Sequence, residues 1–76
     1  MVAKAFVLIE TAVGKTKEVV RSIGDESGVD EVYTVTGPYD IIAVIEKETL
    51  SDIGDLVTSK IHAVKGVTRT VTCLVV

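Results

Sequence analysis

The first part of the chain begins with a short apolar run and then continues with apolar residues at helical spacing. Residues 2–10 predict a strand that is apolar on both faces at its centre, with Phe6 and Leu8 on one of them. Residues 15–26 predict a helix with a narrow apolar stripe and a charged face. Gly28 is well placed to end this helix in a left-handed conformation.

A pair of strands joined by a turn is predicted in the middle of the sequence. Residues 29–36 are rich in β-branched and aromatic residues, and residues 40–46 have a continuous apolar centre, as expected of a strand covered on both faces. Gly37 and Pro38 separate the two runs, and proline disfavours helical geometry in the residue before it. We therefore expect a tight turn over residues 37–40, in which Pro38 takes the second position.

A second helix and a last strand complete the pattern. Thr49 is a typical N-cap, and Asp52 is placed to reach back to it as in a capping box. The helix that follows carries an apolar stripe, formed by Leu50, Ile53, Leu56, Val57, Ile61 and Val64. Gly66 is expected to stop this helix, and residues 67–76 are predicted to form the last strand. One face of that strand carries a polar row, formed by Thr68, Thr70 and Thr72.

The predicted order of elements is therefore β-α-β-β-α-β. This order is typical of the ferredoxin-like α+β fold, a four-stranded antiparallel sheet with two helices on one face. The other face of such a sheet is normally polar, but the strands at residues 2–10 and 40–46 are apolar on both faces. We therefore expect a second chain to cover that face. No linker or repeat divides the sequence, so one domain is predicted for residues 1–76.

The composition favours a small domain that associates with itself. A chain of 76 residues buries only roughly 60% of its unfolded surface when it folds alone. Yet 47% of the residues are hydrophobic, which is more apolar surface than one small core hides. The net charge is −3 and the basic residues are scattered, so direct nucleic-acid binding is not expected. No segment resembles a membrane span or a signal peptide, which predicts a cytoplasmic protein without membrane contact.

Few side chains of the sequence are candidates for catalysis, metal binding or disulfide formation. Cys73 is the only cysteine, which excludes an intrachain disulfide and a cysteine-based metal site. His62 is the only histidine, lies near the end of the second helix, and has no obvious nucleophile or metal-binding partner. We expect no metal and no cofactor. The sequence also lacks Cys-x-x-Cys, interleaved basic and aromatic residues, and any Asn or Gln, which disfavours soft-metal chaperones, RNA-recognition motifs and acylphosphatase-like sites.

The hairpin bend holds the most suggestive polar groups. Asp40 suits a ligand ammonium group, whereas the Thr36 hydroxyl and the Gly37 backbone suit a ligand carboxylate. Turn side chains of these types commonly satisfy their own backbone, and spacing alone favours that ordinary role. Threonines at alternate positions of a strand commonly form cross-strand hydroxyl pairs. The row in the last strand is therefore a candidate for ligand binding only if it lies near the bend.

Three sequence motifs, one of them in the bend, connect the chain with a known protein family. The chain resembles the effector-binding (RAM) domain of the Lrp/AsnC transcriptional regulators over nearly its whole length, in Val35-Thr36-Gly37-Pro38-Tyr39-Asp40, Gly66-Val67 and Thr70-x-Thr72-x-x-Val75. The resemblance implies a ferredoxin-like domain that dimerises through its sheet. It also implies that dimers assemble into octameric or decameric rings, with amino-acid effectors bound between dimers. The implied ligand-binding residues are Thr36, Gly37, Pro38, Tyr39, Asp40, Thr70 and Thr72.

The resemblance implies a non-enzymatic module that binds an amino acid and takes part in regulating amino-acid metabolism or transcription. Full regulators of the family carry an N-terminal helix-turn-helix domain, whereas this sequence starts at the first strand, as in the stand-alone RAM proteins. An effect on transcription then needs a partner, such as a full-length Lrp/AsnC regulator in a mixed ring, or buffering of the effector. Two alternatives stay open. One is a small dimeric α/β-barrel enzyme that uses His62 or Asp40 as general base in a cavity of each protomer, and the other is a purely structural oligomerisation module.

Overall fold

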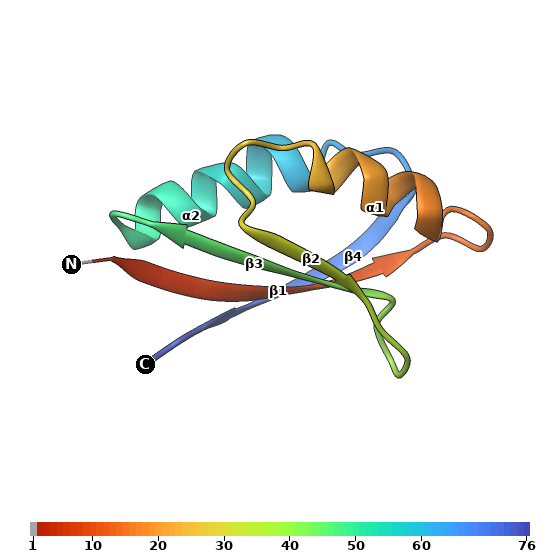
Figure 1. The fold of residues 1–76 in the computed structure, drawn as a ribbon, viewed down its shortest axis with the longest axis horizontal. Coiled ribbons are helices and arrows are strands. Elements are labelled where there is room, and N and C mark those ends of the chain that lie inside the picture. The colour runs from red at the N-terminus through yellow and green to blue at the C-terminus, as the bar shows by residue number, and fades with distance from the viewer. Residues whose placement is uncertain (1) are drawn as a thin grey trace.

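The computed structural model describes residues 2–76 and has the predicted order of elements (Figure 1). Its strands are β1 (Ala3–Thr11), β2 (Glu31–Thr34), β3 (Ile41–Lys47) and β4 (Val67–Leu74). Its helices are α1 (Thr16–Gly24) and α2 (Leu50–Leu56), and α2 runs directly into a wider helical turn, η1 (Val57–Ile61). The ferredoxin-like prediction is confirmed, although the elements are slightly shorter or shifted at their ends.

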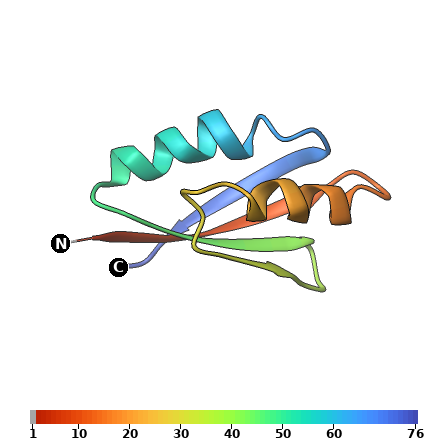
Figure 2. The same cartoon turned by 45° about the horizontal axis from the view of Figure 1, so that its top comes forward.

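The sheet is antiparallel throughout, in the order β2-β3-β1-β4. β1 and β3 are its central strands, and Ile9 of β1 lies opposite both Ile41 of β3 and Thr70 of β4. Both helices cover the same face of the sheet, as Figure 2 shows. We call the opposite face the open face. This arrangement leaves β2 and β4 as the two edges of the sheet.

The core lies between the sheet and the helices. Every second side chain of β1 and β3 points into this core: Ala5, Val7, Ile9, Ile41, Ala43 and Ile45. The helical layer adds Val19, Ile23, Ile53, Val57 and Ile61. All of these side chains are at most 6% exposed. Burying an aliphatic side chain of this size contributes about 1.5–3 kcal/mol, so this layer holds the helices on the sheet.

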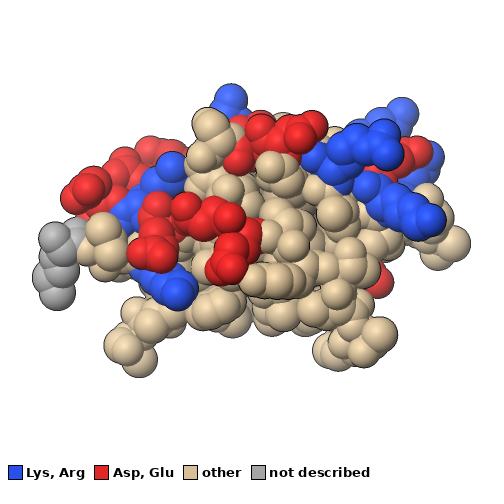
Figure 3. Space-filling view, viewed as in Figure 1, with Lys and Arg blue, Asp and Glu red and all other residues tan. Residues whose placement is uncertain are grey.

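The open face is also apolar, as the pattern of β1 and β3 predicts. Phe6 is 38% exposed and Tyr33 is 51% exposed, whereas Val44, the strand partner of Phe6, is only 3% exposed. Leu8 and its partner Ile42 are half-buried. Charged side chains gather over the helices and their loops, and the surface below them in the view is mostly uncharged (Figure 3). Such a face suits contact with another protein surface rather than with water.

The glycines at 66 and 28 have different roles. The second helical segment ends at Ile61, so the prediction that it continues until Gly66 is wrong. Gly66 lies in the turn before β4 with φ +104°, and a Cβ there would lie 2.9 Å from Val19 Cγ2. Gly28 has no positive φ, so its predicted left-handed conformation is wrong. α1 ends instead with the Asp25 N–H bonded to a carbonyl of its own last turn. The absence of a side chain at Gly28 leaves room for the Leu56 side chain, because a Cβ at this position would lie 2.9 Å from Leu56 Cδ1.

The second helical segment starts as predicted. Thr49 Oγ1 accepts a hydrogen bond from the Asp52 N–H at 3.1 Å, which satisfies one of the free donors of the first turn. The return bond of a capping box, from the Thr49 N–H to the Asp52 carboxylate, is not among the hydrogen bonds of residues 2–76. None of the helices in this range is long and apolar enough to cross a membrane.

Candidate functional site

The hairpin between β2 and β3 is wider than predicted. The Val35 N–H donates to the Asp40 carbonyl at 2.9 Å, and Gly37 has φ +125°. The Asp40 N–H does not return to the Gly37 carbonyl, as it does in a hydrogen-bonded turn over residues 37–40, but donates to the Ile9 carbonyl of β1 at 2.9 Å. The chain bends at Gly37 and Pro38, but no hydrogen bond of the described residues closes positions 37–40 into a turn. The segment forms an open loop that projects from the sheet on the side away from the helices (Figure 1).

Asp40 is anchored by the end of β1. Its Oδ2 atom accepts hydrogen bonds from the Thr11 N–H at 2.9 Å and from Thr11 Oγ1 at 3.2 Å. Thr11 Oγ1 in turn lies 2.8 Å from Thr16 Oγ1 at the start of α1. The second carboxylate oxygen, Oδ1, has no hydrogen-bond partner among the described residues. One carboxylate thus links the loop, β1 and α1 and still presents a free oxygen.

The rest of the loop is largely exposed. Thr36, Gly37 and Pro38 are exposed, whereas Tyr39 is half-buried. The Tyr39 ring lies below the Arg69 guanidinium of β4, with 5.9 Å between Arg69 Cζ and the ring centroid. This distance is within the range of a cation–π contact. The loop therefore touches β4 through Tyr39.

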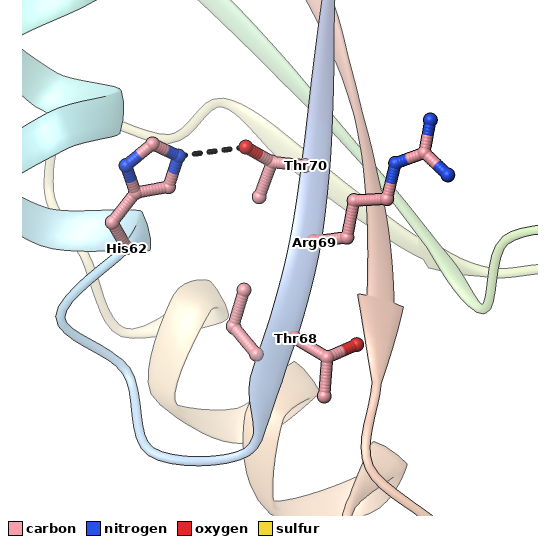
Figure 4. A pocket seen from close by; sticks show the side chains of 5 residues that line it. His62, Thr68, Arg69 and Thr70 are labelled. Atoms are coloured by element: carbon pink, nitrogen blue, oxygen red, sulfur yellow. Dashed lines mark hydrogen bonds between the residues drawn. The ribbon is translucent and has the colours of Figure 1, made fainter.

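Thr70 and Thr72 lie on the helix side of β4. Thr70 Oγ1 is 2.7 Å from His62 Nε2, and Figure 4 shows the two side chains pointing toward each other. They line a hollow of about 280 Å³, together with Val67, Thr68 and Arg69. Thr72 borders a second, more apolar hollow of about 320 Å³ between β4 and α2.

The structure assembles the predicted site residues into two groups. Thr36, Gly37, Pro38, Tyr39 and Asp40 share the hairpin loop, and Thr70 and Thr72 share the helix side of β4. β1 lies between β3 and β4 in the sheet, so it separates the loop from the two threonines within a protomer. A site that uses both groups needs a second chain, and its composition stays a prediction.

His62 has a partner that the sequence pattern did not indicate. η1 places His62 at its end, where the His62 N–H donates to the Val57 carbonyl five residues earlier, and the ring then reaches Thr70. An imidazole beside a hydroxyl is part of a nucleophile–base arrangement, but no described carboxylate orients this ring. The enzyme alternative predicts a cavity within each protomer, whereas both hollows along β4 are open to solvent.

A short hydrogen bond joins two side chains of β2. The Glu31 carboxylate accepts a hydrogen bond from the Tyr33 hydroxyl at 2.6 Å, and this bond raises the pKa of the phenol. Residues 2–76 contain no group of three His, Cys, Asp or Glu side chains that is placed to hold a metal ion. The hairpin loop and β4 offer a carboxylate, hydroxyls and backbone N–H groups.

Comparison with known proteins identifies the family. Residues 4–76 match the family described as the Lrp/AsnC ligand binding domain. The chain belongs to this family. Its similarity to an uncharacterised helix-turn-helix-type transcriptional regulator of Pyrococcus furiosus is 39% identity over 71 residues, which is 90% of this chain and 47% of the regulator. The chain thus spans about half the length of the curated relative that it matches.

Solved structures show the same Lrp/AsnC ligand-binding fold. A protein of Thermus thermophilus is 36% identical and superposes with a TM-score of 0.92, covering 97% of this chain and 92% of that one. A transcriptional regulator of Neisseria meningitidis, solved as its complex with L-Met, is 16% identical with a TM-score of 0.86. That comparison covers 97% of this chain and 49% of the regulator, and it shows the fold alone. The predicted family and fold are confirmed.

Proposed function

We propose that this Lrp/AsnC ligand-binding domain binds an amino-acid effector at the hairpin loop, as a non-enzymatic oligomer that takes part in regulating amino-acid metabolism or transcription. The observation that carries the proposal is the Asp40 carboxylate. Oδ2 is fixed by Thr11, so the group has a defined orientation, and Oδ1 has no partner among the described residues. The L-Met complex of the Neisseria regulator, a neighbour in fold, supports an amino acid as the ligand class.

The loop offers groups for both charges of an amino acid. Asp40 Oδ1 accepts from the ammonium group, a charge-assisted hydrogen bond that is stronger than a neutral one. The backbone N–H groups of Gly37 and Tyr39 make no hydrogen bond within the described part of the chain. Together with the Thr36 hydroxyl, they are available to a carboxylate.

The oligomer brings the second group of site residues to the loop. A second copy covers the open face, where Phe6 and Tyr33 remain exposed in the protomer. Further contacts between dimers build the ring that the family resemblance implies. The hydroxyls of Thr70 and Thr72 from a neighbouring copy then lie beside the loop, which the protomer alone does not achieve. A ligand held at the loop of one copy then also contacts the neighbouring copy.

Regulation acts through a longer relative. The Pyrococcus furiosus regulator carries a matching segment within a chain about twice as long, and its name identifies it as a helix-turn-helix type. A domain that matches 90% of this chain at 39% identity is a suitable partner for the open face in a mixed assembly. A pull-down from the native host that recovers a helix-turn-helix paralogue supports this route. Repeated recovery of the chain alone contradicts it.

A thermal-shift panel of the twenty common amino acids tests the binding proposal. A ligand that binds only the folded state adds about 2.7 kcal/mol of stability at a hundredfold excess over its dissociation constant. We expect a selective rise in melting temperature for one or a few amino acids. The Asp40→Asn variant should lose that rise, whereas Asp55→Asn, the same charge change at an exposed position of α2, should keep it. A flat panel for the unchanged protein contradicts the proposal.

A further inference from the structure

Arg69 occupies an unusual position on the open face. It lies in β4 between Thr68 and Thr70, and its strand partner is Glu10 of β1. Figure 4 shows its side chain leaving the strand on the side away from His62. The guanidinium is thus on the same side of the sheet as the hairpin loop, which the contact with Tyr39 confirms.

No described carboxylate neutralises Arg69. Opposite charges that face each other across antiparallel strands ordinarily pair, and Glu10 is the obvious partner. Glu10 Oε1 instead accepts a hydrogen bond from Thr68 Oγ1 at 2.8 Å. Within residues 2–76, the ion pair closer than 4 Å joins Lys15 and Glu18, at 3.8 Å, and does not involve Arg69. The N–H donors of the Arg69 guanidinium are therefore available to another group.

Tyr39 holds the guanidinium beside the loop. A cation–π contact uses the charge of the guanidinium and takes up none of its N–H donors, and Arg69 makes no side-chain hydrogen bond within residues 2–76. Those donors form a fork that matches a carboxylate with two parallel hydrogen bonds. Tyr39 is also the residue before Asp40, so the residue that contacts Arg69 and the residue with the free carboxylate oxygen belong to one short loop segment.

We propose that Arg69 is the carboxylate-binding residue of the effector site and that Asp40 of the same protomer binds the ammonium group. One strand, β1, separates the two residues, so their backbones lie about 10 Å apart, and side chains extending from both sides leave room for a small zwitterion. The ligand class is then an α-amino acid with both charges free. This inference rests on the proposed function but replaces the loop hydroxyl and backbone as the main carboxylate partners.

Binding of matched ligands to matched variants tests the assignment. The probes are the standard L-amino acid that binds most tightly in the panel, its amide, which lacks the carboxylate, and its N-acetyl derivative, which lacks the ammonium group. Titration calorimetry on the full chain compares Arg69→Met and Arg69→Lys with Arg21→Met, an exposed arginine of α1. Thermal unfolding without ligand verifies that each variant is folded.

We expect Arg69→Met to raise the dissociation constant of the amino acid roughly tenfold to a hundredfold, the usual effect of losing hydrogen bonds to a charged group. Arg69→Lys should restore part of the affinity, and Arg21→Met should change nothing. The amide should bind weakly and equally to the unchanged protein and to Arg69→Met. The N-acetyl derivative should remain sensitive to Arg69→Met but not to Asp40→Asn.

Each contrary result contradicts a different part of the proposal. If Arg69→Met binds the amino acid as tightly as the unchanged protein, the role of Arg69 is refuted while amino-acid binding stands. Equal losses for the acid and the amide, or a change of oligomeric mass without ligand, assign Arg69 a structural role and also refute it. If no amino acid binds the unchanged protein, the proposed function itself fails and this inference fails with it.

Discussion

Replacing Phe6 with alanine should weaken self-association of the chain through its open face. Phe6 is 38% exposed in the protomer. A phenylalanine has roughly 200 Å² of surface, so the exposed part is about 75 Å². Covering it contributes about 2 kcal/mol per copy at about 25 cal/mol per Å². A symmetric dimer contains two such residues, and the total of about 4 kcal/mol corresponds to roughly a thousandfold in the dissociation constant.

Sedimentation velocity over a concentration series measures this effect. Val13→Ala is the control, because Val13 is fully exposed in the loop between β1 and α1, outside the sheet. Phe6→Leu retains most of the apolar area and should recover most of the affinity. Circular dichroism at low concentration verifies that the variants are folded. If Phe6→Ala associates as tightly as the unchanged protein, or if the unchanged protein is monomeric at millimolar concentration, the open face is not the interface.

Two further predictions concern stability and ionisation. Gly66→Ala should lower the free energy of unfolding by about 2–4 kcal/mol, because the new Cβ meets Val19 at 2.9 Å and φ is +104°. Gly24→Ala, with nothing within 4 Å of the new Cβ, should instead leave stability unchanged or slightly raised, and urea denaturation compares them. The pKa of Tyr33 should lie above its usual 10.0 because of the Glu31 bond, and Glu31→Gln should lower it again in an ultraviolet titration. The stabilisation from this bond is present below pH 10.0 and should disappear as the pH rises through the raised pKa; a Tyr33 that titrates at 10.0 in both proteins would contradict it.

The order of elements could be predicted because the core is encoded by local patterns. Val7 and Ile9 alternate as a half-buried strand requires, and Ile53, Val57 and Ile61 recur at helical spacing. Each pattern is complete within a few residues, so no knowledge of distant contacts is needed. Gly28 shows the limit of such reasoning, because its role depends on Leu56, which a helix-end rule does not consider.

The geometry of the site could not be predicted in the same way. The loop conformation is set by Ile9 and Thr11, and Thr11 is separated from Asp40 by 29 residues. The contact between His62 and Thr70 depends on an irregular helical turn that has no clear signal in the sequence. The motif marked the segment that forms the loop, but the hydrogen bonds of this segment follow from the register of the whole sheet.

The wide turn η1 acts as a built-in insertion of one residue. A regular α-helix advances about 100° per residue, so an extra residue rotates everything after it by that angle unless a wider turn absorbs it. If the same residues formed a regular α-helix, the side chain at position 62 would face another direction and would not meet Thr70. A chain that is one residue shorter between Val57 and Ile61 needs no wide turn, because a regular α-helix then leaves the following side chain directed at β4. The wide turn therefore fits one additional residue into the helix while the side chain after it keeps its contact with the sheet.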